Sequence, residues 1–215
     1  MPDKSNAIDE LELLRAAQRF VKDGKTQQNE TFNEVLCQHR ERLKRMVSVR
    51  MNQKLQGRLD ASDVIQDTFV EAARALESYL DSPKISVFMW LRKLAGEKLI
   101  QAHRKHLGAE KRTAHREQAI FGGVPAATSQ VIAIQLSGKL TSPSIAAQKQ
   151  ESKDELMQAL EQMGEIDREI LMLRHFEQLS NKETAEVVGM NYEAVKKRYI
   201  RALDKLRELM MGTSE

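Results

Sequence analysis

The fold is decided by a stretch near the end of the chain, Leu179-Ser180-Asn181-Lys182-Glu183-Thr184-Ala185-Glu186-Val187-Val188-Gly189-Met190-Asn191-Tyr192-Glu193-Ala194-Val195-Lys196. Its Ser180 and Glu183 have the S-x-x-E spacing of a capping box, which predicts that a helix begins here. Gly189 provides the backbone freedom that a tight turn requires, and Asn191 can cap a second helix. These signals predict a helix-turn-helix, a motif whose second helix enters the major groove of DNA.

The predicted second helix has a basic surface. Four of residues 192–201 are Lys or Arg, and Glu193 is the only acid among them. Such side chains can pair with phosphates or with guanine edges. A helical hairpin with a solvated basic face is the alternative. DNA binding is the preferred interpretation because the small Ala185 and the apolar Val195 lie where the motif needs them, although Thr184 replaces the usual aliphatic residue.

Helical patterning extends over most of the chain. Aromatic residues make up only 5%, and Leu, Ala, Glu, Lys, Arg, Gln and Met are abundant, which favours helices over sheet. Apolar residues recur at helical spacing in two groups of segments, at 8–20, 31–56, 61–80 and 86–107 and at 153–163, 166–176, 181–188 and 192–210. The predicted fold class is therefore all-α, with two small helical domains.

A stretch of weak periodicity separates the two groups of helices. Residues 108–150 are interrupted by residues that break helices, namely Gly122, Gly123, Pro125, Gly138 and Ser142-Pro143-Ser144. We expect a flexible linker here, with a short helix near 111–120. The predicted organisation is a domain over residues 1–107, the linker over 108–150, and a second domain over 151–215 that contains the helix-turn-helix.

Composition narrows the class of protein. A formal net charge of +3 on 215 residues is too small to identify a nucleic-acid binder by itself. Cys37 is the only cysteine, which rules out an internal disulfide and favours a reducing compartment. The sequence shows neither the apolar run of about 20 residues that a membrane span needs nor the apolar core of a secretory signal at its start. We expect a cytoplasmic protein without membrane insertion.

The predicted helix at 61–80 has two distinct faces. Its apolar stripe is expected to face the core and contains Ile65, Phe69, Ala72 and Leu76. Another face, at the spacing i, i+3, i+4 and i+7, carries Asp63, Gln66, Asp67 and Val70. An exposed acidic and amide-bearing face with one aliphatic residue suits docking onto a basic partner helix. A solvated helix face is the alternative.

Together, these motifs resemble those of the extracytoplasmic-function family of bacterial RNA polymerase sigma factors. The family's D-x-x-Q-[ED]-x-F helix of region 2 is matched position by position by Asp63, Gln66, Asp67 and Phe69. Residues 88–95 resemble the F-x-x-W-L-x-x-I-A segment that follows in the family. Residues 167–174, the helix-turn-helix and residues 201–207 resemble region 4. Three further features resemble a long-linker branch of the same family. They are the predicted helices within 8–56, the sequence Ser142-Pro143-Ser144 and the run of basic residues at 104–116.

The resemblance implies a protein that binds core RNA polymerase, recognises the minus-10 and minus-35 promoter elements and initiates transcription. It assigns binding of the beta-prime coiled coil to Asp63, Gln66, Asp67 and Val70, and adds the beta flap as a second polymerase contact. It assigns the minus-35 element to Asn191, Tyr192, Lys196, Lys197, Arg198 and Arg201. It assigns the minus-10 element to Tyr79, Lys98, Arg104 and Lys105. It also implies an anti-sigma protein as a partner.

Charge and aromatic residues support the minus-10 assignment. Residues 98–116 hold six Lys and Arg residues against Glu110 alone, which makes a suitable track for a phosphate backbone. An opened DNA strand also needs a surface on which a flipped base can stack. Tyr79, beside the predicted turn, is the candidate for this stacking, whereas Trp90 is expected in the core.

Three alternatives stay open. An enzyme is disfavoured because the sequence has no Gly-rich phosphate loop and no nucleophile motif, and we expect no catalytic residue and no cofactor. No metal site is expected either. His103 and His106 have a spacing compatible with metal binding, but they lie among Lys and Arg residues, which disfavour a cation. A stand-alone helix-turn-helix regulator would leave the face around Asp63 without a purpose. A degenerate sigma factor acting as an adaptor is suggested by Glu97 and Gln101, which replace residues common in the family.

Overall fold

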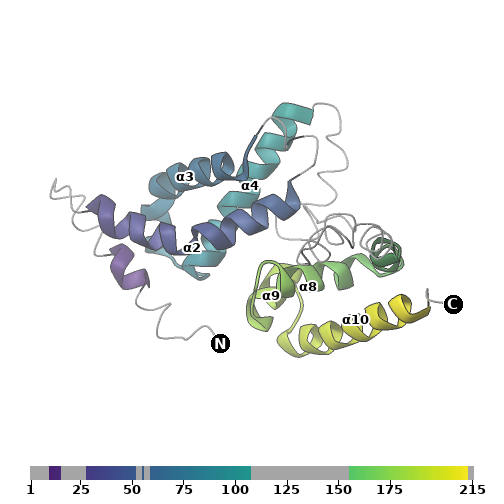
Figure 1. The fold of residues 1–215 in the computed structure, drawn as a ribbon. Coiled ribbons are helices and arrows are strands. Elements are labelled where there is room, and N and C mark those ends of the chain that lie inside the picture. The colour runs from purple at the N-terminus through teal and green to yellow at the C-terminus, as the bar shows by residue number, and fades with distance from the viewer. Residues whose placement is uncertain (1–9, 16–27, 52–54, 56–58, 108–154, 213–215) are drawn as a thin grey trace. The chain divides into compact units, whose positions relative to one another are not determined.

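The computed structural model describes residues 10–15, 28–51, 55, 59–107 and 155–212 (Figure 1). Within these ranges every regular element is a helix, so the predicted all-α class is confirmed. The described helices belong to two compact units, each of which is considered by itself. The linker predicted at 108–150 and its short helix at 111–120 lie outside the described residues, and the predicted domain limits stay a prediction.

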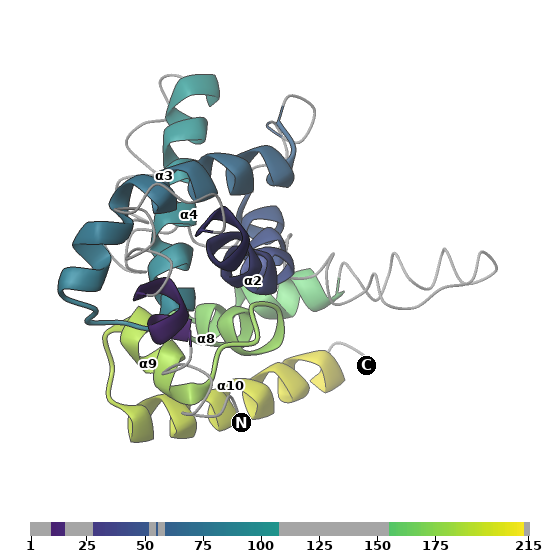
Figure 2. The same ribbon diagram turned by 90° about the vertical axis from the view of Figure 1, so that its left-hand side faces the viewer.

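The first unit contains α2 (Gln28–Arg50), α3 (Ala61–Asp81) and α4 (Val87–Leu107), which pack against one another (Figures 1 and 2). A helical segment also covers residues 10–15, within the helix predicted at 8–20. The core side chains of α3 and α4 include Ile65, Ala72, Leu76, Leu91, Leu94, Ala95 and Leu99, whereas the predicted core residues Phe69 and Ala102 are only half-buried. Each large apolar side chain contributes about 1.5–3 kcal/mol by leaving water.

Helix α2 ends earlier than its sequence pattern predicts. The apolar spacing suggested a helix to Gln56, but α2 ends at Arg50. Met51 and Leu55 lie beyond this end and are both buried, with 3% and 0% of their surface exposed. Part of the apolar pattern therefore reflects burial of these two side chains outside α2.

Helix α3 begins at a reciprocal capping box. The Asp60 carboxylate accepts a hydrogen bond from the Ser62 backbone N–H at 2.6 Å, and the Asp63 carboxylate accepts one from the Asp60 N–H at 2.9 Å. These bonds satisfy donors that the first turn of a helix leaves without intrahelical partners. Asp60 is therefore the N-cap residue of α3.

The second unit contains α8 (Glu165–His175), α9 (Asn181–Val188) and α10 (Tyr192–Gly212), preceded by a helical segment over residues 155–161. α8, α9 and α10 all pack against one another (Figure 1). α9 has the predicted bounds, and α8 and α10 begin within one residue of their predicted starts. The core between these helices includes Ile170, Leu173, Val195 and Ala202.

Arg168 joins the helical segment at 155–161 to α8. Its guanidinium donates hydrogen bonds to the carbonyl oxygens of Leu160 at 3.0 Å and Met163 at 2.8 Å. The last turn of a helix leaves such carbonyl groups without intrahelical partners, and an Arg side chain can satisfy them. Arg168 thereby fixes the angle at which α8 leaves the preceding segment, although Gly164 gives α8 no side-chain cap.

Candidate nucleic-acid interface

The predicted helix-turn-helix forms from α9 and α10. The Ser180 hydroxyl accepts a hydrogen bond from the Glu183 N–H at 3.2 Å, and the Glu183 carboxylate accepts one from the Ser180 N–H at 2.7 Å. Gly189 ends α9 with a φ of 66°, in the left-handed region, and its N–H donates to the Ala185 carbonyl. The capping box and the turn glycine are thus both confirmed.

The departure from the motif at Thr184 is accommodated inside the unit. Thr184 is fully buried, and its hydroxyl donates to the Ser180 carbonyl at 2.8 Å. The polar atom is therefore satisfied within its own turn of helix, while the methyl group packs. Ala185 and Val195 are both buried, as the motif requires.

The outer surface of α10 presents the predicted basic residues. Lys196, Lys197 and Arg201 are exposed, and Tyr192 in the first turn keeps 48% of its surface exposed. Asn191 is exposed too, and its side-chain oxygen accepts a hydrogen bond from the Ala194 N–H at 2.7 Å and so caps α10. Its assignment to the minus-35 element stays a prediction.

Arg198, which was assigned to DNA with its neighbours, lies against α8 and is half-buried. Its Nε lies 2.5 Å from a carboxylate oxygen of Asp167 in the first turn of α8. Only 34% of the Arg198 side chain and 28% of the Asp167 side chain are exposed. The assignment of Arg198 to DNA stays a prediction, while in this structure an ion pair with α8 holds its guanidinium.

A second set of contacts ties α10 to the end of α8. The Tyr199 hydroxyl hydrogen-bonds the His175 imidazole at 3.1 Å, and the Arg174 guanidinium lies over the Tyr199 ring at 5.3 Å. Arg174 also donates a hydrogen bond to the Leu179 carbonyl in the loop that leads to α9. One arginine therefore links α8, the loop before α9 and the recognition helix.

The face of α3 that was predicted to dock a partner is exposed along its length. Asp63, Gln66 and Asp67 are exposed, and Val70 keeps 52% of its surface exposed. Asp63 also belongs to the capping box of α3, so it contributes to the helix start as well as to this face. We call these four residues the acidic face of α3.

The minus-10 candidates on α4 divide into two groups. Arg104 and Lys105 are exposed. Lys98 instead lies 2.7 Å from a carboxylate oxygen of Glu71 on α3 and keeps only 19% of its side chain exposed, so its charge is already paired. The hydrogen bond and charge of Lys98 lower the pKa of the Glu71 carboxyl. Burial lowers the pKa of the His103 imidazole, which disfavours its charged form.

Tyr79 does not present an open ring to a flipped base. Only 7% of its surface is exposed, and its ring stacks on Trp90 with centroids 4.3 Å apart and planes 8° apart. Its hydroxyl donates to the Ile85 carbonyl at 2.7 Å, and burial raises its pKa to about 12. The stacking prediction for Tyr79 is corrected: it lies in the core with Trp90, as was expected of Trp90 alone.

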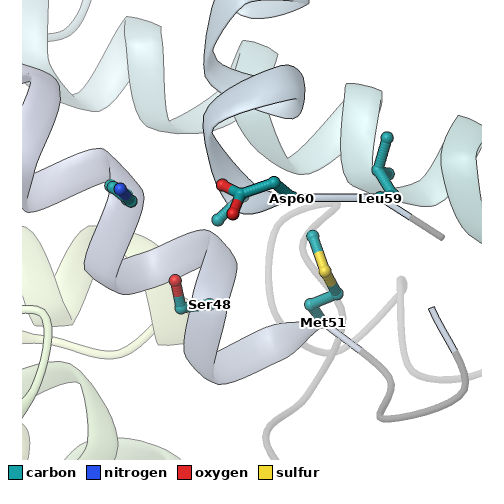
Figure 3. Close-up of a pocket in the computed structure, with 6 residues that line it drawn as sticks. Ser48, Met51, Leu59 and Asp60 are labelled. Atoms are coloured by element: carbon teal, nitrogen blue, oxygen red, sulfur yellow. The ribbon is translucent and has the colours of Figure 1, made fainter. Parts of the chain in front are cut away.

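A small pocket lies between the end of α2 and the start of α3 (Figure 3). Its volume is about 180 Å³, and its lining residues are Lys44, Ser48, Met51, Leu59, Asp60 and Ala61. None of the predicted contact residues is among them. Within the described ranges, no group of His, Cys, Asp or Glu side chains could hold a metal ion. No helix in the described part of the chain is long and apolar enough to cross a membrane.

Two ion pairs within the units could not be predicted from the sequence. Glu71 and Lys98 are 27 residues apart, and Asp167 and Arg198 are 31 apart. Helical spacing relates residues three or four positions apart and does not show which side chains meet between helices. Asp167 and Glu71 were accordingly missed.

Comparison with known proteins identifies both units. The model for Sigma-70 region 2 matches residues 38–107, and the model for Sigma-70, region 4 matches residues 153–206. Together these matches span more than half of the chain. NccH of Alcaligenes xylosoxydans xylosoxydans, an RNA polymerase sigma factor, is 27% identical over 72% of this chain and 75% of its own. CnrH of Cupriavidus metallidurans, another RNA polymerase sigma factor, is 28% identical over 73% of this chain and 76% of its own.

A solved structure shares the fold. The structure of CnrH in complex with the cytosolic domain of CnrY matches 95% of this chain and 99% of that chain, with a TM-score of 0.51 and 21% identity. Region 2 and region 4 in one chain define a sigma factor of the sigma-70 type. The chain belongs to this family as an RNA polymerase sigma factor, which acts on promoter DNA and initiates transcription.

Proposed function

We propose that this sigma factor divides its work between the two surfaces described above. The acidic face of α3 binds the beta-prime coiled coil of core RNA polymerase, and the second unit contacts the beta flap. The protein acts in the cytoplasm and selects promoters without catalysing a reaction of its own. The observation that carries this proposal is the exposed acidic face of α3 in one unit together with the exposed basic surface of α10 in the other.

The DNA contacts follow from exposure and charge. Lys196, Lys197 and Arg201 lie on the outer surface of α10, where they can meet phosphates or base edges of the minus-35 element, and Tyr192 extends this surface at the start of the helix. Arg104 and Lys105 form the minus-10 contact on α4. Lys98 and Tyr79 are left out of the direct contacts because Glu71 and Trp90, respectively, already engage them.

Regulation by an anti-sigma protein is part of the proposal. The solved structure of CnrH contains the cytosolic domain of CnrY, and the resemblance of this chain to the family implies a comparable partner. A partner that covered the acidic face of α3 would prevent the protein from binding polymerase.

We also propose that the chain belongs to the long-linker branch of the extracytoplasmic-function family. The sequence Ser142-Pro143-Ser144 and the run of basic residues at 104–116 support this assignment.

The polymerase contact can be tested without disturbing the fold. Asp63 is a poor target, because it also caps α3. The combined variant Gln66→Ala, Asp67→Asn should weaken binding to core polymerase about tenfold, since interface energy concentrates in a few residues. Its matched control is Glu41→Gln, which neutralises an acid on α2 whose side chain is 76% exposed. Titration of labelled protein with core enzyme gives both affinities.

Two outcomes would contradict the docking proposal. The first is an unchanged affinity for core polymerase in the α3 variant. The second is an equal loss in the Glu41 control, which would indicate a general effect of charge. A stand-alone regulator would show specific promoter binding without core enzyme, whereas the proposed sigma factor needs core enzyme for selectivity.

A further inference from the structure

The recognition helix α10 has two sides with different tasks. Val195 and Ala202 are buried and lie seven residues apart, with Arg198 between them on the same face. Lys197 and Arg201 are exposed and lie four residues apart on another face. Arg198 therefore carries the same charge as its exposed neighbours but faces α8.

The ion pair of Arg198 gives α10 a defined direction. Asp167 lies in the first turn of α8, and its carboxylate oxygen accepts from the Arg198 Nε at 2.5 Å. Each side chain is about one third exposed, so the pair is partly shielded from water. A planar guanidinium donates in fixed directions, which makes this contact more directional than a lysine ammonium would be.

A second contact, a hydrogen bond, limits how α10 can move on α8. His175, at the other end of α8, hydrogen-bonds the hydroxyl of Tyr199, the residue after Arg198. Asp167 and His175 are eight residues apart, about 12 Å along a helix. Two neighbouring residues of α10 are therefore held by the two ends of α8, and this arrangement opposes rotation of α10 about its axis.

We infer that Asp167 is a positioning residue for reading DNA and acts through Arg198. The pair fixes the rotation of α10 and thereby decides which side chains reach the groove. A rotation of about 20° moves a side-chain tip by roughly 2 Å at the outer radius of a helix. Such a displacement is enough to break a hydrogen bond to a base or phosphate. The inference rests on the proposed minus-35 role of α10.

The direction in which one substitution changes DNA affinity distinguishes a positioning role of Asp167 from a purely electrostatic one. Asp167→Asn removes a negative charge from the unit that binds DNA. If Asp167 only competed with phosphate for Arg198, its loss would free a cation and strengthen DNA binding. If Asp167 positions α10, the same loss weakens binding, although the net charge becomes more favourable for DNA.

The experiment measures holoenzyme binding to two promoter fragments, one with its own minus-35 element and one with that element scrambled. Asp167→Asn should weaken binding to the first fragment about threefold to tenfold, the range expected for a partly shielded charged pair, and should leave binding to the second unchanged. The matched control is Glu165→Gln, which removes an exposed acid from the same turn of α8 and should not weaken binding.

The salt dependence of DNA affinity is the second measurement. A variant that merely failed to fold would not reproduce the pattern of slopes expected here. Lys197→Gln should lower the slope of log affinity against log salt by about one, as expected when a phosphate contact is lost. Arg198→Gln should weaken binding like Asp167→Asn but keep the wild-type slope. The double variant at 167 and 198 should bind like either single variant, because both remove the same contact.

The outcomes are distinguishable. Binding that is equal to or tighter than wild type in Asp167→Asn overturns the positioning role, as does a slope lowered by about one in Arg198→Gln. If the wild-type holoenzyme does not distinguish the two fragments, the proposed minus-35 function fails and the inference fails with it.

Discussion

Gly189 shows how one residue sets the geometry of the DNA-binding motif. It adopts a φ of 66° between α9 and α10, where residues with a Cβ atom are disfavoured. An added Cβ would meet no atom within 4 Å, so the expected cost is conformational and not steric. The turn therefore requires backbone freedom at this position.

Replacing Gly189 with Ala should lower the free energy of unfolding by about 1 kcal/mol, and replacing it with Asn should recover part of this loss. Urea unfolding followed by circular dichroism measures both changes. Gly212→Ala is the matched control, since Gly212 also has open space around it but lies in α10 without a positive φ. Equal stability of Gly189→Ala and wild type would show that the left-handed turn is not required.

Adjacent residues of α10 show why charge alone did not define the contact surface. Lys197 is exposed, whereas the next residue, Arg198, turns inward toward Asp167 because each step along a helix rotates the side chain by about 100°. The basic run was visible in the sequence. Its division into an outward and an inward part depends on the position of α8.

At the scale of helices, the accuracy of the sequence predictions follows the distance between the residues involved. The Ser180–Glu183 capping box was predictable because its partners are three positions apart. The Glu71–Lys98 pair joins two helices, and nothing in the periodicity of either helix indicates it. Tyr79 was misjudged for the same reason: proximity to a turn suggested exposure, but packing against Trp90 on α4 buries it.

The Glu71–Lys98 pair also predicts a pH dependence for the stability of the first unit. Lys98 lowers the pKa of Glu71 below the ordinary value of 4.5, so the folded state favours the charged carboxylate. The resulting stabilisation is present above pH 4.5 and is lost as the pH falls through the lower pKa of the folded state.

Glu71→Gln should therefore melt at a lower temperature than wild type at neutral pH, and the difference should shrink as the pH falls toward about 3. Thermal melts of both proteins across this range measure the effect, and comparison with wild type cancels the titration of other groups. A difference that stays constant with pH would show that the ion pair does not contribute through its charge.

At the scale of the whole molecule, the proposed function depends on two surfaces that different helical units carry. The acidic face of α3 exposes carboxylates and an aliphatic side chain, which we propose bind polymerase, while α10 exposes cations, which we propose bind DNA. A protein with the DNA surface alone would act as an ordinary regulator. Their combination in one chain, with the matches to Sigma-70 regions 2 and 4, accounts for a factor that brings polymerase to promoters.

The most direct test of this account is transcription in vitro with core RNA polymerase on genomic DNA of the source organism, with and without the protein, followed by sequencing of the transcript starts. We expect new starts that share two sequence elements at a fixed spacing, and we expect the Gln66→Ala, Asp67→Asn variant to reduce all of them. Transcript starts that stay at the level of core enzyme alone, at every site on that DNA, would contradict the account.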